Sequence, residues 1–216
     1  MTLFGLRLDQ LGLFALAVLL LALTPGPVWI YLISRTLTQG RRAGYFSLIG
    51  VMAGVVVHLL AAALGLSALL LALPAAFNAI KLAGAAYLLW LAWSTLRGSG
   101  FSFTPQPLDH VPDGVLFRQS LTASVVNPKV AVFYLSLFPQ FVDPASGPVL
   151  LQSLALGVVH ITVSTSIDGG LVTVAGALSA WIARRPGWLR MQRWFLGGAF
   201  GVLAVWLAAT PRHSSS

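Results

Sequence analysis

Apolar residues fill long stretches of this chain, and short polar stretches separate them. Six apolar segments reach the roughly 20 residues that cross a bilayer as a helix. They cover residues 9–37, 44–73, 75–96, 115–141, 148–182 and 192–210. Connections such as QGRRAG and DPASGP combine glycine or proline with charged residues, as loops do. The pattern therefore predicts six transmembrane helices.

The composition favours a membrane protein over a water-soluble one. Of the 216 residues, 57% are hydrophobic and 8% are charged, and the mean hydropathy is +0.87. A soluble domain carries roughly 25% charged residues. This chain has too few to cover a surface that faces water, so we expect an all-α membrane protein.

The formal net charge of +8 does not indicate nucleic-acid binding. The basic residues lie almost entirely between the apolar segments and form no patch interleaved with aromatic residues. Arginines that flank a membrane explain them better. The chain has no cysteine, which excludes disulfides and thiolate metal ligands, and we expect neither a metal nor another cofactor.

The longest polar connection, RGSGFSFTPQPLDHVPDG, divides the chain into two halves of three segments each. Because three is an odd number, the two halves have opposite orientations in the bilayer. We therefore expect one transmembrane domain, residues 1–216, built as a 3+3 inverted repeat. Its halves are about 9–96 and 115–210.

Basic residues are distributed unequally between the two sides of the predicted bundle. The first, third and fifth connections and their margins hold nine: Arg35, Arg41, Arg42, Arg97, Arg118, Arg184, Arg185, Arg190 and Arg193. The other side holds only Arg7, Lys81 and Arg212. Lysine and arginine stay preferentially on the cytoplasmic side, so we expect both termini outside the cytoplasm.

The first and fourth segments each contain prolines where a helix would otherwise continue. The residues at these interruptions are Thr24, Pro25, Gly26 and Pro27 in the first and Asn127, Pro128 and Lys129 in the fourth. A proline inside a helix costs about 3 kcal/mol, and non-helical backbone at membrane depth must be buried in protein or line a cavity. Interruptions at matching positions of inverted halves predict a transporter site at the midplane, where a half-helix directs free N–H groups at an anion. A proline kink without function is the alternative.

Two charged residues lie well inside predicted spans, where charge is costly and a function is expected. Lys129 lies near the middle of the fourth span, and Asp168, past the middle of the fifth, is the only acid within any span. If transport is coupled to protons, Asp168 is the carboxylate that can serve. A structural Lys129–Asp168 salt bridge is one interpretation, and a pair that exchanges partners during transport is the other.

Further polar groups lie within the second and fifth spans. His58 is near the middle of the second, and a histidine titrates near neutral pH, which suits proton exchange; a packing histidine bonded to a neighbouring oxygen is the alternative. The fifth span carries a polar stripe that is expected to face a cavity: His160, Thr162, Ser164, Thr165 and Ser166. Such hydroxyls can also bond their own helix backbone.

Glycines at helical spacing predict close helix contacts. The pairs are Gly50 with Gly54 and Gly197 with Gly201. They permit a homo-oligomer but do not require one.

Several longer motifs follow one another in a specific order. They are LTPGP and GRRAG, then GVVVHLLAAALGL, IKLAGAAYLLWLAW, NPKVAVFYLSLFPQFVDP and RWFLGGAFGVLAVWLA. With these motifs the chain closely resembles the LysE/RhtB family of bacterial amino-acid exporters over essentially its whole length.

The resemblance implies an exporter of amino acids or close derivatives in the bacterial cytoplasmic membrane, driven by the proton gradient. The residues that match the family's motifs are Thr24, Pro25, Gly26, Pro27, Asn127, Pro128 and Lys129 for substrate contact, and Asp168 and His58 for proton coupling. The expected partners are an amino acid, protons and the lipid bilayer. The single acid within the spans favours a neutral amino acid. Gly169 and Gly170 stand where members commonly carry bulky residues, so we expect a locally loose helix there.

Two other function classes each fit part of the sequence. The stretch GLSA, residues 65–68, fits the loose pattern of intramembrane serine proteases, with Ser67 as nucleophile and His160 as base. The match is short, and no oxyanion donors are evident. A passive channel would share the polar residues but needs neither inverted broken helices nor a titratable centre. We therefore expect a secondary transporter and not an enzyme.

Overall fold

The structure is a computed structural model that describes residues 2–72 and 108–183, with isolated positions between 79 and 93 and positions 202 and 205. Apart from a short hairpin of β1 (Thr2–Leu3) and β2 (Leu6–Arg7), the described part is helical. The helices are α1 (Leu8–Leu23), α2 (Pro27–Ala72), α4 (Asp113–Val125), α5 (Pro128–Val132), a π-helical turn η1 (Phe133–Leu137), a 3₁₀ turn η2 (Phe138–Phe141) and α6 (Val149–Ala183). The third and sixth predicted spans lie almost entirely outside this part, although the positions described within them are helical.

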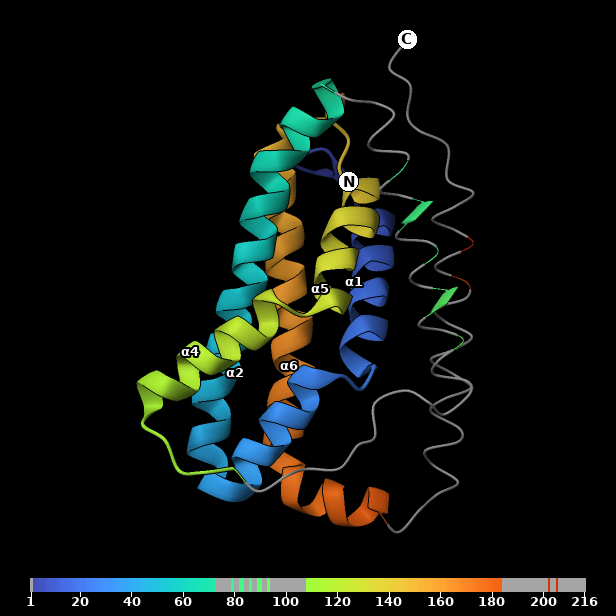
Figure 1. The fold of residues 1–216 in the computed structure, drawn as a ribbon. Coiled ribbons are helices and arrows are strands. Elements are labelled where there is room, and N and C mark those ends of the chain that lie inside the picture. Colours follow the sequence, from blue (N-terminus) through green and yellow to red (C-terminus); the bar gives the residue numbers. More distant parts are fainter. Residues whose placement is uncertain are drawn as a thin grey trace.

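The first third of the chain contains a helix break and a reversal of direction. α1 ends at Leu23, and α2 begins at Pro27, a first helical position where proline loses no hydrogen bond. Gly40 interrupts α2 with φ 86° and ψ 172°, a conformation that glycine adopts readily. The chain therefore descends through α1 and residues 27–39 and returns through residues 41–72 (Figure 1). This path agrees with the predicted segments 9–37 and 44–73.

The second helix break separates α4 from α5. The axis of α4 and that of the segment Pro128–Phe141 differ by 48°. Asn127 is the N-cap of α5, and its side-chain oxygen accepts a hydrogen bond from the Lys129 backbone N–H at 3.1 Å. The expectation of a loose helix at Gly169 and Gly170 is wrong, because α6 is helical through both residues. The hydrogen bonds of a helix join backbone groups, which glycine also has, so the helix continues through both residues.

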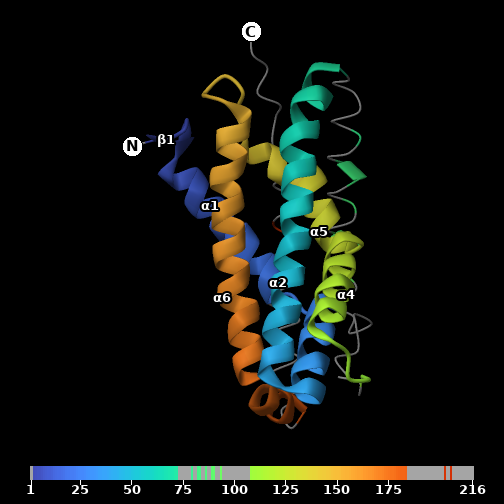
Figure 2. The ribbon, with the colours of Figure 1, turned by 90° about the vertical axis from the view of Figure 1, so that its left-hand side faces the viewer.

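The long helices pack side by side, with the second half of α2 beside α4 and α6 (Figure 2). A side chain at Gly50 or Gly54 would collide with α4, at Phe117 and Ser120 or at Ser124. The close contact predicted for this glycine pair is confirmed; Gly197 and Gly201 lie outside the described residues. An apolar cluster centred on Phe14 of α1 joins η1, η2 and α6.

Hydrogen bonds near Gly40, at what we call the Gly40 end of the molecule, hold α4 and the residues just before it against α2. Buried Arg35 donates to the side-chain oxygens of Gln39 and Gln119 and to the backbone oxygen of Asp109, at 2.6–2.9 Å. Arg42 forms an ion pair with Asp113 at 2.8 Å. These contacts hold α4 against α2 at the Gly40 end, away from both helix breaks.

The described helices are apolar enough for a membrane. By length and composition, the stretch Pro27–Gly65, which reverses at Gly40, and the stretch Val149–Ala175 each hold a helix that could cross one, and α4 with Pro128–Phe141 could form a third, bent span. The protein is thus a mainly helical membrane protein. The six spans of the 3+3 repeat, and the place of both breaks within them, stay predictions.

Candidate functional site

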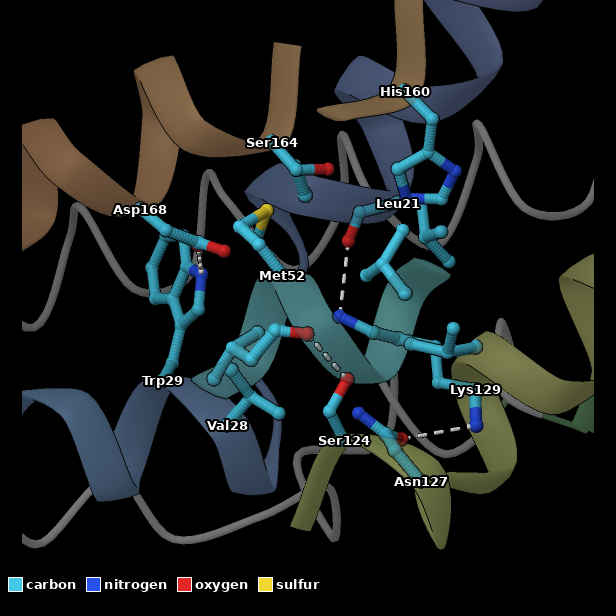
Figure 3. Close-up of a pocket in the computed structure, with 14 residues that line it drawn as sticks. Leu21, Val28, Trp29, Met52, Ser124, Asn127, Lys129, His160, Ser164 and Asp168 are labelled. Carbon is cyan, nitrogen blue, oxygen red and sulfur yellow. Dashed lines mark hydrogen bonds between the residues drawn. The ribbon is translucent and has the colours of Figure 1, made fainter. Parts of the chain in front are cut away.

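A small cavity of about 40 Å³ lies between the two helix breaks (Figure 3). Apolar side chains of α1, α2 and α5 form much of its wall. Its polar lining comes from Ser124, Asn127 and Lys129 around the second break and from His160, Ser164 and Asp168 on α6. A cavity needs roughly 10–15 Å³ to hold a water, so this one has room for water.

Lys129 links the two breaks. Its ammonium group donates to the backbone oxygens of Leu21 and Thr24, each at 2.9 Å, at the end of α1 (Figure 3 draws the first bond). The last carbonyls of a helix lack helical partners and carry partial negative charge. A cation from the second break therefore caps the helix at the first. In the described part of the chain, ion pairs join Arg7 to Asp9 and Arg42 to Asp113, and none joins Lys129 to Asp168.

Asn127 presents a free donor beside this cation. The residue is 2% exposed, and its Oδ1 is occupied by the Lys129 N–H. Its Nδ2 is buried and has no hydrogen-bond partner within the described residues. A buried donor without a partner costs about 1–3 kcal/mol. Because the amide lines the cavity beside an ammonium group, this wall suits an anion such as a carboxylate.

Asp168 forms the opposite wall. Its carboxylate accepts a hydrogen bond from the indole N–H of Trp29 at 3.0 Å, and the side chain is 6% exposed. Figure 3 shows Asp168 entering the cavity from α6 and Lys129 from α5. The sequence did not single out Trp29. Its position two residues after Pro27 was the available signal.

The polar stripe of α6 divides into two faces. His160, Ser164 and Asp168 follow at four-residue intervals, are buried and line the cavity. The other members, Thr162, Thr165 and Ser166, are exposed. The Ser166 hydroxyl donates to the Thr162 carbonyl of its own helix at 2.7 Å, so only part of the stripe faces the cavity.

The two histidines meet at Tyr134. The His160 Nδ1 and the Tyr134 hydroxyl are 3.0 Å apart and hydrogen-bonded. The rings of His58 and His160 both lie within 8° of parallel to the Tyr134 ring, with centroids 5.8 and 5.3 Å from it. The Nε2 of His58 also lies 3.4 Å from the carbonyl oxygen of Ser124. His58 does not line the cavity with Asp168.

The remaining predicted residues shape the backbone at the breaks. The Thr24 hydroxyl donates to the Leu20 carbonyl at 2.7 Å, so its backbone oxygen, not its side chain, contacts Lys129. Pro25, Gly26 and Pro27 form the bend, and a Cβ at Gly26 would lie 3.6 Å from the Lys129 Nζ. Pro128 opens α5.

The cavity carries opposite charges on its two walls. A cation and an amide donor lie on one wall and a carboxylate on the other, which suits a small molecule that carries both charges. Pockets for such ligands measure roughly 300–1,000 Å³, so the cavity has to widen to admit one. The described residues hold no group of three or more His, Asp or Glu side chains able to bind a metal ion.

Comparison with known proteins gives a consistent picture. The family model of the LysE type translocators matches residues 19–210. The chain is 33% identical over 195 residues to the homoserine/homoserine lactone efflux protein of Salmonella typhimurium, covering 90% of this chain and 93% of the relative. It is 34% identical over 199 residues to an uncharacterised membrane protein of Pseudomonas aeruginosa, covering 90% and 89%. It is 31% identical over 134 residues to the leucine efflux protein of Salmonella choleraesuis, covering 60% and 62%. No solved structure matches significantly.

Proposed function

Because this chain belongs to the LysE type translocator family, we propose that it exports amino acids or close derivatives from the bacterial cytoplasm in exchange for protons. The relatives named for homoserine and leucine efflux support the substrate class. The observation that carries the proposal is the cavity between the two helix breaks, with the Lys129 ammonium and Asn127 amide on one wall and the Asp168 carboxylate on the other.

The substrate carboxylate binds at the second break. It accepts hydrogen bonds from the free Nδ2 of Asn127 and from Lys129, whose ammonium group then shares or leaves the oxygens of Leu21 and Thr24. The bend of Thr24 to Pro27 and the start of α5 at Pro128 supply the backbone around it. Releasing the end of α1 from Lys129 loosens the first break, which allows the cavity to widen.

Asp168 couples export to protons. A single carboxylate holds either a proton or the substrate's ammonium group, so the two compete for it. A proton that arrives from the outside displaces the substrate, and a new substrate in the cytoplasm displaces the proton. Only one acid lines the cavity among the described residues, which favours amino acids of no net charge. His58, which stacks on Tyr134, is another candidate for proton exchange.

The orientation follows from the arginines. The Gly40 end, with Arg41 and Arg42, faces the cytoplasm, and the connection at 142–148 faces outward. Since the chain has no cysteine, Ala145→Cys and Arg41→Cys test this directly, both being exposed positions. A membrane-impermeant thiol reagent added to intact cells should label the first and not the second; the opposite pattern would reverse the orientation.

The experiment that tests the function measures amino-acid efflux from cells loaded with a mixed dipeptide pool, with and without a proton gradient. Wild type should export one or a few amino acids in a gradient-dependent manner. Asp168→Asn, at matched protein level, should lose this export. Asp109→Asn, a change of the same kind at an exposed residue near the Gly40 end, is the control and should export normally.

Three results would count against the proposal. Efflux that runs only downhill and ignores the gradient would indicate a passive channel. Normal export by Asp168→Asn would remove that residue from the coupling. Loss of folded Asp168→Asn protein would give its contact with Trp29 a structural role.

A further inference from the structure

We propose that His160 is a second proton-binding residue of this transporter, and that it passes protons to Asp168 along the cavity-facing side of α6. This inference rests on the proposed proton exchange at Asp168. It adds a residue that neither the family match nor the helix breaks single out.

The geometry of α6 places the two groups on one path. His160, Ser164 and Asp168 are separated by four residues each, so they follow one another on the same face at roughly 6 Å intervals. All three line the same cavity, and their exposed fractions are 2%, 6% and 6% (Figure 3). The cavity has room for water, and water together with the Ser164 hydroxyl can bridge a gap that the side chains do not close directly.

Tyr134 fixes the imidazole in place. Its hydroxyl is bonded to His160 Nδ1 at 3.0 Å, which sets the orientation of the ring toward the cavity. Tyr134 lies on the π-helical turn η1, and π-helical turns occur frequently at functional sites. The rings of Phe14 and Phe133 pack against His160 edge-on, with centroids 6.5 and 5.3 Å away. A polar ring enclosed by aromatic residues is held in one orientation.

His160 lies between Asp168 and the outward-facing end of α6, from which protons enter. It lies about two turns closer to the start of α6, which begins at the connection proposed to face outward. A proton moving inward down its gradient therefore meets His160 before Asp168. The other titratable groups that surround His160 within the described residues are Tyr134 of η1, His58 of α2, which stacks on Tyr134, and Lys129 of α5, which lines the same cavity.

The test separates proton-driven transport from exchange of substrate for substrate. Purified protein is reconstituted in vesicles, and labelled L-homoserine and L-leucine are followed in two assays, one driven by an imposed pH gradient and one by counterflow without a gradient. His160→Gln keeps a polar side chain but cannot carry the proton. We expect its gradient-driven rate to fall at least about tenfold while counterflow stays within about twofold of wild type.

A matched pair of serines tests the path between the two groups. Ser164→Ala removes the hydroxyl that lines the cavity, and Ser166→Ala removes one that is exposed and bonded to its own helix. The first should slow gradient-driven transport several-fold, and the second should leave it unchanged. Equal rates in the two variants would place the path away from Ser164 and overturn the proposed proton path along α6.

Tyr134→Phe keeps His160 and the ring stacking and covers the case in which His160→Gln does not fold. Loss of one hydrogen bond should shift the pH at half-maximal gradient-driven rate by about half a unit to one unit. An unchanged pH profile would overturn the role of His160. A purely structural histidine would change both assays together, and that result in folded His160→Gln would overturn it as well.

Asp168→Asn in the same assays distinguishes this inference from the proposed function. Loss of gradient-driven transport in Asp168→Asn but not in His160→Gln would overturn the role of His160 alone. Normal gradient-driven transport in both variants would overturn both.

Discussion

The two helix breaks both contain proline, yet their exposed backbone groups are satisfied in different ways. At the second break, Asn127 caps α5 with its own side chain, and Pro128 occupies the first helical position. At the first break, Thr24 caps part of the end of α1 locally, because its hydroxyl donates to the Leu20 carbonyl and its backbone N–H to the Leu21 carbonyl. The Leu21 and Thr24 carbonyls also accept hydrogen bonds from Lys129, a residue more than one hundred positions away in the sequence.

This difference assigns different tasks to the two breaks. The second break keeps its shape by itself, so it can present Asn127 and Lys129 as fixed donors. The first break depends in part on the second, and anything that draws Lys129 away removes two hydrogen bonds from the end of α1. A substrate carboxylate at Asn127 does this by offering Lys129 a better partner, because a full negative charge binds an ammonium group more strongly than a carbonyl dipole does.

The largest effect is expected from Lys129→Met, which removes the link between the breaks. Hydrogen bonds to a charged group contribute about 1.5–3 kcal/mol each, so export should fall about tenfold to a hundredfold or more, and thermal unfolding in detergent should begin at a lower temperature. Lys129→Arg keeps the charge and should recover part of the stability. A stable, active Lys129→Met protein would show that the end of α1 does not need its cation.

The next largest effect is expected from Asn127→Asp, which separates capping from binding. Aspartate caps a helix as well as asparagine does, but it replaces the free Nδ2 donor with an acceptor. The apparent affinity for the exported amino acid should fall about tenfold, while stability stays within about 1 kcal/mol. Asn127→Ala, which loses the cap as well, is the comparison. Unchanged affinity in Asn127→Asp would limit Asn127 to capping.

A smaller effect is expected from Trp29→Phe, because the aromatic packing against Ile33 and Leu171 remains. Only the hydrogen bond to Asp168 is lost, so the maximal rate should change a few-fold and the pH at half-maximal rate should shift by about half a unit to one unit. Tyr45→Phe removes a hydrogen bond between side chains away from the cavity and should shift nothing. A pH profile that is the same in Trp29→Phe and wild type would separate the indole from proton exchange.

The smallest effect is expected from Pro128→Ala. Proline at the first helical position loses no hydrogen bond, and the cap at Asn127 remains, so the cost should be about 0.4–1 kcal/mol with export within a few-fold of wild type. Thermal unfolding and efflux measure the two quantities. A severe loss of export would mean that the proline ring itself, rather than the cap, sets the bend.

The sequence by itself determined where the helices end. Proline at positions 27 and 128 and glycine at position 40 act through their own backbone, so their effect needs no knowledge of distant residues. For the same reason the sequence singled out Asn127, Lys129 and Asp168, because polar groups inside apolar segments are conspicuous in any fold.

The tertiary structure alone decided which groups meet. The sequence left two interpretations of Lys129 open, a structural salt bridge with Asp168 or a pair that exchanges partners. In the structure its ammonium group donates to the Leu21 and Thr24 oxygens, which no local pattern predicts. The partner of Asp168 is Trp29, 139 positions away, and no periodicity within either segment encodes that contact. The polar stripe of α6 was visible, but which of its sides is the buried one depends on the rotation of the helix against its neighbours. Such contacts arise from the packing of whole helices, which is a sum over many weak interactions and cannot be assigned to single positions in the chain.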